Sequence, residues 1–154
     1  MARLIGVISD THGLMRPQAL DALRGCELII HAGDVGTPDI LDALRALAPT
    51  HAVRGNVDKG AFGHTLPMTE LIDVGGRLIH VLHIIEEVDL DPPTAGCAAV
   101  IFGHSHKPSI ATRDGVLYLN PGSAGPRRFD LPVSLARLRV GETGLAPELV
   151  TLQV

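Results

Sequence analysis

The sequence predicts an α/β fold in which two packed β-sheets are flanked by helices. Short apolar runs rich in β-branched residues recur along the chain and have the length of buried strands. In the first half these runs alternate with amphipathic segments, as in a parallel β-α-β arrangement. In the second half they occur in pairs separated by short turns, which is typical of hairpins. The runs that precede polar clusters are 4–8, 28–30, 52–53, 78–82, 100–102 and 116–119.

The first half predicts two helices between three parallel strands. Residues 15–23 carry apolar side chains at helical spacing behind Pro17, which suits a first helical turn, and Gly25 ends the segment. Residues 39–47 repeat the pattern, with Thr37 as the expected N-cap and a proline at the first helical position. The chain therefore begins as βαβαβ.

The second half predicts antiparallel strands. Hairpins are expected over 67–82, 110–119 and 133–154. The first of them turns at Gly75-Gly76, a two-residue hairpin turn. Residues 94–99 are expected to form a short helix ahead of strand 100–102.

Composition limits the class of protein. The 154 residues suit one domain over 1–154, with 45% hydrophobic and 3% aromatic residues. The apolar stretches are strand-sized and no signal-peptide pattern begins the chain, so we expect a cytoplasmic protein with no membrane contact. A net charge of −4 with scattered cations argues against binding long nucleic acid. Cys26 and Cys97 are expected as reduced, buried thiols. Whether the protein forms a homo-oligomer is not decided by the sequence.

Polar clusters follow each of the six apolar runs. They are Asp10-Thr-His12, Gly33-Asp34, Gly55-Asn56, His83, Gly103-His104-Ser-His106 and Asn120-Pro-Gly-Ser123. In an open α/β sheet, groups just beyond the carboxyl ends of strands share one crevice. Nitrogen and oxygen donors without cysteine suit a pair of divalent metal ions. The seven candidate donors are Asp10, His12, Asp34, Asn56, His83, His104 and His106.

Each cluster alone also has a structural explanation. Asp10 and Asp34 could cap helices, and Asn56 could be a turn residue that tolerates left-handed dihedrals. The pair His104 and His106 is more specific, because residues two apart in an extended segment face the same way. The joint placement of all the clusters at one edge favours the metal site.

The other histidines are expected outside that site. His83 ends its strand and can reach the crevice, whereas His80 lies mid-strand, faces the other side and is expected to be structural. His31 is expected to be a satisfied strand residue or a partner that supports a ligand from behind. His51 and His64 fall in loop-like contexts and are expected to be exposed to solvent.

Residues around the expected crevice leave alternatives open. The segment from Asn120 to Ser123 is either a tight turn or part of the pocket that orients ligands or phosphate. Arg127 and Arg128 form either a solvated pair or a phosphate clamp. Asp58 is either a loop carboxylate or a group on the pocket rim.

The ordered motifs Asp-x-His, Gly-Asp, Gly-Asn, a strand-end His and Gly-His-x-His resemble the calcineurin-like metallophosphoesterase superfamily. The short spacing and the ending Asn-Pro-Gly-Ser resemble its small single-domain phosphodiesterase branch, and the match runs from Asp10 to about Arg128. The resemblance implies a four-layer αββα sandwich of two mixed sheets flanked by helices. By the resemblance, one metal is held by Asp10, His12, Asp34 and His106. The other is held by Asp34, Asn56, His83 and His104.

The resemblance further implies a dimetal phosphoesterase that acts on a small phosphate ester. Two cations about 3.5–4 Å apart can generate a bridging hydroxide for in-line attack on phosphorus. Asp34, Asn56 and His83 are the expected catalytic residues. We expect manganese, with iron, zinc, cobalt and nickel as alternatives that the same donors admit.

Two positions depart from the pattern of the superfamily. Val57 stands where many monoesterases have a histidine that protonates the leaving alcohol, and Ile84 stands where many relatives have glycine. Loss of that acid could cost about 10²–10⁴-fold with poor leaving groups, so a phosphodiesterase is favoured. The alternatives are a broad phosphomonoesterase and a non-catalytic protein-interaction scaffold on the same fold, as in the retromer subunit that resembles these enzymes. The complete donor set favours an enzyme.

Overall fold

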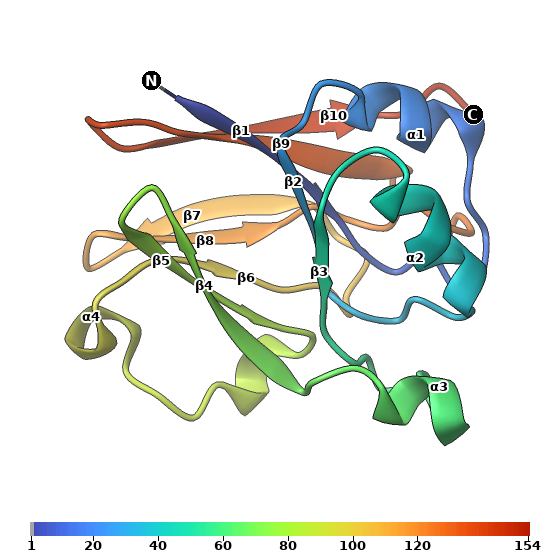
Figure 1. The fold of residues 1–154 in the computed structure, drawn as a ribbon, viewed down its shortest axis with the longest axis horizontal. Coiled ribbons are helices and arrows are strands. Elements are labelled where there is room, and N and C mark those ends of the chain that lie inside the picture. Colours follow the sequence, from blue (N-terminus) through green and yellow to red (C-terminus); the bar gives the residue numbers. More distant parts are fainter. Residues whose placement is uncertain (1) are drawn as a thin grey trace.

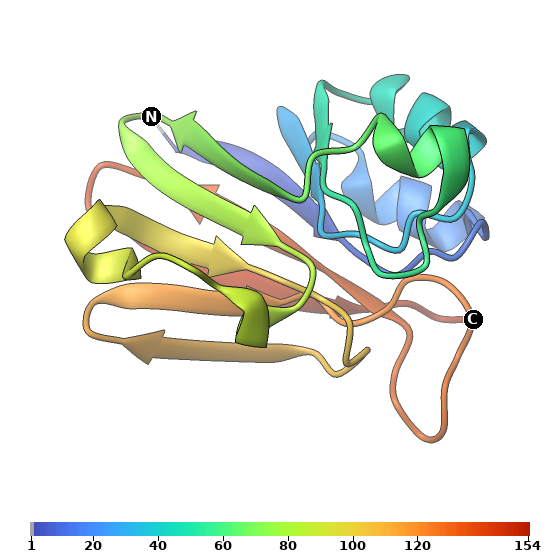
Figure 2. The ribbon, with the colours of Figure 1, turned by 90° about the horizontal axis from the view of Figure 1, so that it is seen from below.

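In the computed structural model, which describes residues 2–154, two five-stranded sheets pack face to face (Figure 1). The strand order is β10-β9-β1-β2-β3 in the first sheet and β4-β5-β6-β8-β7 in the second. Helices α1, α2 and α3 group on one side of the molecule, and α4 lies on the opposite side (Figures 1 and 2). This is the four-layer αββα sandwich that the sequence predicts.

The first sheet has a parallel half and an antiparallel half. Its strands are β1 (Arg3–Ile8), β2 (Leu28–His31), β3 (Thr50–Ala52), β9 (Ser134–Val140) and β10 (Leu145–Thr151). The first three are parallel, as the βαβαβ pattern predicts, and β9 adds to β1 in the antiparallel sense. Two helices, α1 (Pro17–Leu23) and α2 (Pro38–Arg45), connect the parallel strands.

Both connecting helices begin at the predicted prolines. Thr37 occupies the N-cap of α2, but its hydroxyl makes no capping hydrogen bond. Helix α2 ends at Arg45, two residues before the predicted end, and β3 begins two residues earlier and ends one residue earlier than predicted. The observed ends of these elements differ from the predicted ones, but the elements follow one another in the predicted order.

The second sheet has three parallel strands between two antiparallel edges. Its strands are β4 (Thr69–Val74), β5 (Arg77–Leu82), β6 (Cys97–Ile101), β7 (Ser109–Arg113) and β8 (Val116–Asn120). Strands β5, β6 and β8 are parallel, whereas β4 and β7 pair as the predicted hairpins. The sequence predicts the hairpins but not the parallel centre.

Three short helical segments complete the fold: α3 (Gly60–His64), the 3₁₀ turn η1 (Ile85–Glu87) and α4 (Pro92–Ala95). The predicted helix over 94–99 is displaced: the short helix ahead of β6 is α4, at Pro92–Ala95, and residues 97–99 belong to the strand. Helix α4 ends where Gly96 turns left-handed with a φ of 79°. Cys97 and Ala99 then enter β6 and are buried. Burial in a parallel strand overrides the helix propensity of alanine.

The apolar core lies in two main layers. Between the sheets, small and branched side chains such as Val7, Val81 and Ile101 pack together. On the outer face of the first sheet, Leu23 and Ile40 from the helices pack against the strands. Cys26 and Cys97 are free and buried, and burial raises the pKa of both thiols. No helix within residues 2–154 is long and apolar enough to cross a membrane.

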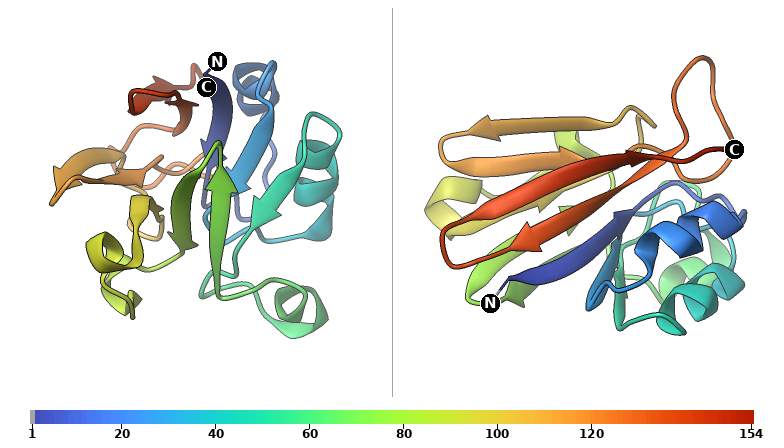
Figure 3. Two further views of the ribbon diagram at one scale, coloured as in Figure 1. Left: turned by 60° about the vertical axis from the view of Figure 1, so that its left-hand side comes forward. Right: turned by 90° about the horizontal axis from the view of Figure 1, so that it is seen from above.

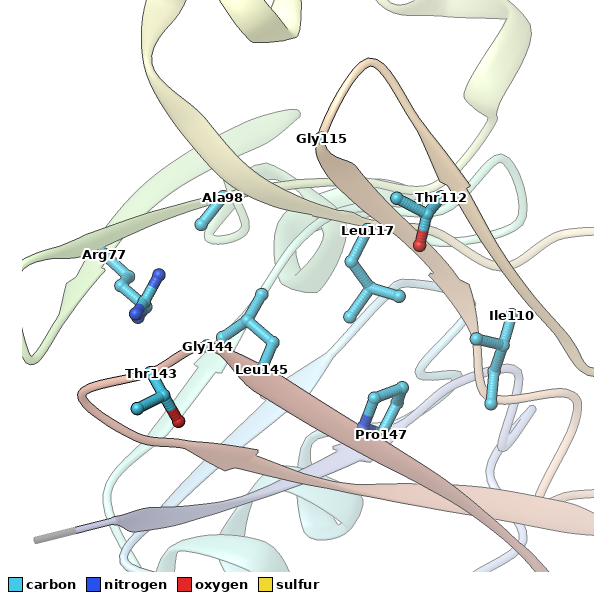
Figure 4. Close-up of a pocket in the computed structure, with 10 residues that line it drawn as sticks. All are labelled: Arg77, Ala98, Ile110, Thr112, Gly115, Leu117, Thr143, Gly144, Leu145 and Pro147. Carbon is cyan, nitrogen blue, oxygen red and sulfur yellow. The ribbon is translucent and has the colours of Figure 1, made fainter.

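The sandwich is open between β10 and the β7–β8 hairpin. A cavity of about 450 Å³ lies there, lined by apolar residues such as Leu117, Leu145 and Pro147 (Figure 4). Arg77 also lines it, and its Nε and Nη2 donate to the carbonyl oxygens of Gly141 at 3.0 Å and Glu142 at 2.9 Å. The cavity adjoins the amino ends of β5 and β8, away from the polar clusters.

Candidate metal centre

The loops after the parallel strands of both sheets meet at one end of the sandwich and carry all seven predicted donors. The loops after β1 and β2 run side by side, because the backbone N–H of His12 donates to Asp34 O at 3.0 Å. The loops after β5 and β6 are joined in the same way by Gly103 N–H and His83 O, at 3.0 Å. The sequence-predicted crevice is therefore where the structure brings these residues together.

Asp10, His12 and His106 form the first group of donors. Their ligand atoms all lie within 4.8 Å of one another. Asp10 Oδ1 is 3.3 Å from His106 Nε2 and 3.7 Å from His12 Nε2, and the two Nε2 atoms are 3.4 Å apart. Three donor atoms thus point at one small volume.

Asp34, His83 and His104 form the second group, again with donor atoms within 4.8 Å of one another. His83 Nε2 is 3.1 Å from Asp34 Oδ2. Asn56 joins them from the next loop, with its Oδ1 3.1 Å from His104 Nδ1. Asn56 and His104 are exposed, whereas Asp34 and His83 are buried. The group is therefore open to solvent on one side.

Asp34 lies between the two groups. Besides its contact with His83, its Oδ2 is 3.7 Å from His12 Nε2. Its other oxygen, Oδ1, accepts a hydrogen bond from the backbone N–H of Val57 at 3.0 Å. One carboxylate oxygen therefore faces histidines of both groups, while the other is anchored to the backbone.

Several buried donor atoms have no hydrogen-bond partner within residues 2–154. These atoms include Asp10 Oδ1, His83 Nε2 and His106 Nδ1. His83 Nε2 lies within ion-pair distance of Asp34, but the two groups lack hydrogen-bond geometry. Buried polar atoms without partners are unfavourable. Imidazole nitrogens that surround a carboxylate oxygen without hydrogen-bonding to it fit a divalent cation.

The charges at the centre favour ionised carboxylates. Burial alone would raise the pKa of Asp10, but His106, His12, His83 and the Ser9 hydroxyl outweigh it and hold that pKa well below its ordinary value. Burial would likewise raise the pKa of Asp34, yet contact with His83 and the Val57 N–H lowers it. Anionic oxygens are the form that binds a metal ion.

The backbone of the donors is strained. Seven non-glycine residues within 2–154 have positive φ, and five of them are predicted donors: Asp10 (57°), His12 (48°), Asp34 (56°), His104 (74°) and His106 (63°). This left-handed region is unfavourable for residues with a Cβ. Strain of this kind persists where surrounding contacts hold it, and it clusters at functional sites.

At two positions of the motifs, steric crowding explains why the residue is glycine. A Cβ at Gly55 would overlap the backbone nitrogen and Oδ1 of Asp34. A Cβ at Gly103 would overlap the hydroxyl of Ser9 and press on Asp10 Oδ2. The glycines in Gly-Asn and Gly-His therefore let neighbouring loops approach the carboxylates closely.

Asp58 does not lie on the pocket rim. It is 4% exposed, and its carboxylate accepts the backbone N–H groups of Val35 (3.1 Å), Gly36 (3.0 Å) and Gly55 (2.9 Å). Of the two alternatives open from the sequence, the loop carboxylate is correct. Asp58 ties the loop after β2 to the loop after β3.

Asn120 and Ser123 also connect loops. Asn120 Nδ2 donates to Gly103 O at 3.2 Å, and Ser123 Oγ donates to Asp10 O at 2.9 Å. Both side chains are buried. Ser123 thus holds the backbone of the donor Asp10, and Asn120 holds the backbone next to the donor His104.

Arg127 and Arg128 lie in the loop between β8 and β9, which projects from the molecule (Figures 2 and 3). Both are exposed, and neither side chain makes an ion pair within the described part of the chain. Arg127 and Arg128 therefore fit the solvated pair better than the phosphate clamp. A substrate contact by either residue stays a prediction.

The remaining histidines are all outside the two groups. His80 is buried and neither ring nitrogen has a hydrogen-bond partner within residues 2–154. The expectation of exposed loop positions is wrong for His51, which is half-buried in β3 with its Nδ1 2.9 Å from Glu70 Oε2. His64 is exposed, but in α3. His31 is fully buried behind the centre.

Sequence reasoning missed two hydroxyl residues of the centre. Ser9 Oγ donates to Asp10 Oδ2 at 2.6 Å, and Thr11 Oγ1 donates to Val35 O at 2.8 Å. Their only signal is position, because they alternate with the donors Asp10 and His12. A hydroxyl in that place is equally typical of a solvated turn.

Comparison with known proteins agrees with these features. A family model described as the calcineurin-like phosphoesterase superfamily domain matches residues 4–143. A probable metallophosphoesterase of Methanothermobacter thermautotrophicus is 36% identical over 159 residues, which cover 96% of this chain and 91% of the relative.

Solved structures share the fold over nearly the whole chain. A structure described as a novel archaeal phosphodiesterase has a TM-score of 0.78 at 19% identity and covers 96% of this chain and 99% of its own. Wild-type Vps29 from Entamoeba histolytica, complexed with zinc, has a TM-score of 0.71 at 26% identity and covers 97% of this chain and 99% of its own. A protein described as a phosphodiesterase and Vps29 thus share this architecture.

Proposed function

Because the chain belongs to the calcineurin-like phosphoesterase superfamily, we propose that it hydrolyses small phosphate esters with two divalent metal ions, and that phosphodiesters are its preferred substrates. One observation carries the proposal: two adjacent groups of donors share the carboxylate of Asp34, which faces histidines of both. Two such groups are what a two-ion centre needs.

We divide the donors between the ions according to the two groups of ligand atoms, with Asp34 shared by both ions. Asp10, His12, Asp34 and His106 would hold one ion. Asp34, Asn56, His83 and His104 would hold the other. When bound, such ions lower the pKa of water to supply a nucleophile and neutralise the charge of the phosphate.

The residues of the chain orient these donors. His83 Nδ1 lies 2.7 Å from Ala32 O, so it carries the proton and donates it, which leaves the lone pair of Nε2 facing Asp34. The Val57 N–H fixes one oxygen of Asp34, so the other oxygen points into the centre. Asn56 and His104 border the open side, from which a phosphate would enter.

The preference for diesters rests on what surrounds the leaving group. The side chain at position 57 is an exposed valine, 46% accessible, which cannot donate a proton. The next acid, Asp58, is buried and occupied by three backbone N–H groups. With no acid from this segment, alcohols that leave easily as anions should react best.

Two solved structures support different parts of the proposal. The archaeal structure with the same fold is described as a phosphodiesterase. The zinc complex of Vps29 shows that a protein of this fold binds a divalent ion. We favour manganese for this chain, with iron, zinc, cobalt and nickel as alternatives, because mixed carboxylate, amide and imidazole donors accept all of them.

The test combines metal content with turnover. Elemental analysis of the purified protein is followed by metal removal, reconstitution with each ion, and assays on bis-p-nitrophenyl phosphate and p-nitrophenyl phosphate. We expect about two ions per chain and faster turnover of the diester. A reconstituted protein that hydrolyses neither ester, or that binds no divalent ion, contradicts the proposal.

A scaffold is the second candidate, because Vps29 shares the fold over nearly its whole length. It predicts that the protein is inactive on all esters even when two ions are bound. Turnover that is lost in Asp34→Asn and depends on added metal would exclude it for this chain.

A further inference from the structure

His31 joins two donor loops that come from neighbouring strands. It is the last residue of β2, and its ring is fully buried. Its Nε2 lies 3.0 Å from Thr11 Oγ1, between the donors Asp10 and His12. Its Nδ1 accepts the backbone N–H of Gly33 at 3.1 Å, next to Asp34.

These contacts fix where the proton of His31 lies. Thr11 Oγ1 donates its single hydrogen to Val35 O at 2.8 Å. The hydroxyl can therefore only accept from His31, so Nε2 carries a hydrogen. Because Gly33 donates to Nδ1, that nitrogen carries none. The ring is a neutral imidazole with one defined tautomer.

The environment keeps the ring in that form. Burial lowers the pKa of His31 to about 4, although Asp10, Asp58 and Asp34 oppose the shift. A neutral ring donates on one side and accepts on the other, which is what its two partners require. A protonated ring would turn both nitrogens into donors and leave the Gly33 N–H without a partner.

The loops that His31 joins are the strained ones. Asp10, His12 and Asp34 all hold positive φ, and the backbones of the two loops bond directly through His12 N–H and Asp34 O. The distance from Asp34 Oδ2 to His12 Nε2, 3.7 Å, depends on how these loops are set against each other. A buried side chain that bonds to both loops limits that motion.

We propose that His31 is a positioning residue of the metal centre, which holds the loop of Asp10 and His12 against the loop of Asp34 at the spacing that the donor groups require. The inference rests on the proposed function, since it assumes that these donors bind metal. His31 does not touch the donor atoms. It acts through Thr11 and the Gly33 backbone.

The test measures metal binding rather than turnover. Mn²⁺ is titrated calorimetrically into metal-free protein, and the visible absorption of the Co²⁺ form reports ligand geometry. The variants are His31→Phe, which removes both bonds, His31→Gln, which can restore a donor, and Thr11→Val. His80→Phe is the matched control, because it replaces another buried histidine, in β5 of the second sheet, whose ring nitrogens have no hydrogen-bond partners within residues 2–154.

We expect His31→Phe and Thr11→Val each to weaken Mn²⁺ binding by about 10–100-fold, the usual effect of losing a partner behind a ligand. The Co²⁺ spectrum should change in both. His31→Gln should recover part of the affinity, and His80→Phe should bind like wild type. The double variant His31→Phe/Thr11→Val should lose less affinity than the product of the two single losses, because both substitutions remove the hydrogen bond between Thr11 and His31.

Two results overturn the inference. One is Mn²⁺ affinity in His31→Phe equal to that in His80→Phe. The other is a double variant whose loss is the product of the two single losses. If His31→Phe does not fold, Thr11→Val and Thr11→Ser decide, since only the serine keeps the hydroxyl. A wild-type protein that binds neither ion overturns the proposed function itself, which is a distinguishable outcome.

Discussion

The two ends of the sandwich turn the chain by different means. At the amino end of β5, the hairpin turn uses Gly75 and Gly76, with φ of 58° and 84°. Glycine takes such angles at little cost because it has no Cβ. At the opposite end, Asp10, Asp34 and His106 adopt similar angles with full side chains. The β7–β8 hairpin at the amino end also uses one non-glycine residue, Asp114 at 51°, beside Gly115. Left-handed residues with side chains are therefore concentrated at the carboxyl end, where five predicted donors adopt such angles.

The same two ends differ in what they bury. The cavity at the amino end is lined by apolar side chains such as Leu117 and Leu145 together with Thr112 and Arg77, and Arg77 donates hydrogen bonds to backbone carbonyls. The carboxyl end buries charged and polar side chains, some without partners: Asp10, His31, Asp34, Asp58, His83, His106, Asn120 and Ser123. Buried polar side chains and backbone strain occur together at the carboxyl end, as is typical of functional sites.

The largest expected effect comes from neutralising the residue between the donor groups. Asp34→Asn keeps the size of the side chain but removes the charge shared by both ions, so turnover should fall by about 10³-fold or more. The fold should persist, because the asparagine oxygen can still accept the backbone N–H of Val57. Turnover is measured with saturating metal, and the melting temperature is the control. Near-normal turnover would contradict the two-ion assignment.

A matched substitution at the other end sharpens the contrast. Leu117 is 7% exposed and lines the cavity. Leu117→Ala should lower the free energy of unfolding by about 2–5 kcal/mol and leave metal affinity unchanged. Calorimetric metal titration and chemical denaturation measure the two quantities. Loss of metal affinity in this variant would mean that the two ends are not independent.

The pH dependence of stability should also come from the carboxyl end. The pKa of His31 is lowered from 6.5 to about 4 by burial, so the folded state favours the neutral ring. Its contribution is complete above pH 6.5 and is lost as the pH falls from 6.5 to 4. The loss should reach about 3 kcal/mol.

Denaturant unfolding of metal-free protein between pH 4 and pH 7 measures this loss. The control is His31→Gln, which has no group that titrates in this range. Other carboxylates and histidines contribute equally to both proteins, so the difference in slope isolates His31. Parallel pH profiles for the two proteins would show that burial does not keep His31 neutral.

Two histidines of one sheet test the division of roles within it. His83 follows β5 and faces Asp34, whereas His80 lies mid-strand and touches neither donor group. His83→Ala should lower metal occupancy and turnover by at least about 10–100-fold, the cost of losing a partner of a ligand, because it removes a donor itself. His80→Ala should chiefly lower the melting temperature, because it leaves a cavity. Equal effects on metal content would contradict the assignment by strand parity.

Much of this architecture could be predicted because its signals are local. Prolines at the first helical positions fixed where α1 and α2 begin, and Gly75-Gly76 marked a hairpin. The donor clusters were visible because each follows an apolar run, and strands of that kind end in a shared crevice.

The rest depends on contacts between distant segments. The parallel pairing of β5, β6 and β8 leaves no local signal, since β7 lies between β6 and β8 in the sequence. The inward direction of Asp58 is set by backbone N–H groups of another loop. The bond between Thr11 and His31 likewise joins residues 20 apart. Such partners become visible only once the loops are placed.

The smallest expected effect concerns position 57, at the open side of the centre. If no residue there protonates the leaving oxygen, the rate should depend steeply on the pKa of the leaving alcohol, so aryl diesters should react well and alkyl monoesters poorly. Val57→His keeps the backbone N–H that holds Asp34 and places an imidazole at an exposed site. A general acid contributes about 10²–10⁴-fold when it is well positioned.

This imidazole would have no partner to orient it, so Val57→His should raise turnover of alkyl monoesters by only about 10-fold and should flatten the leaving-group dependence. The measurement is a series of aryl and alkyl esters assayed with wild type, Val57→His and Val57→Ala, the last controlling for the change in bulk. Asp58→Asn should not alter the slope, because that carboxylate is buried and bonded to backbone N–H groups. A shallow slope already present in wild type would mean that another group protonates the leaving oxygen, and the preference for diesters would lose its physical basis.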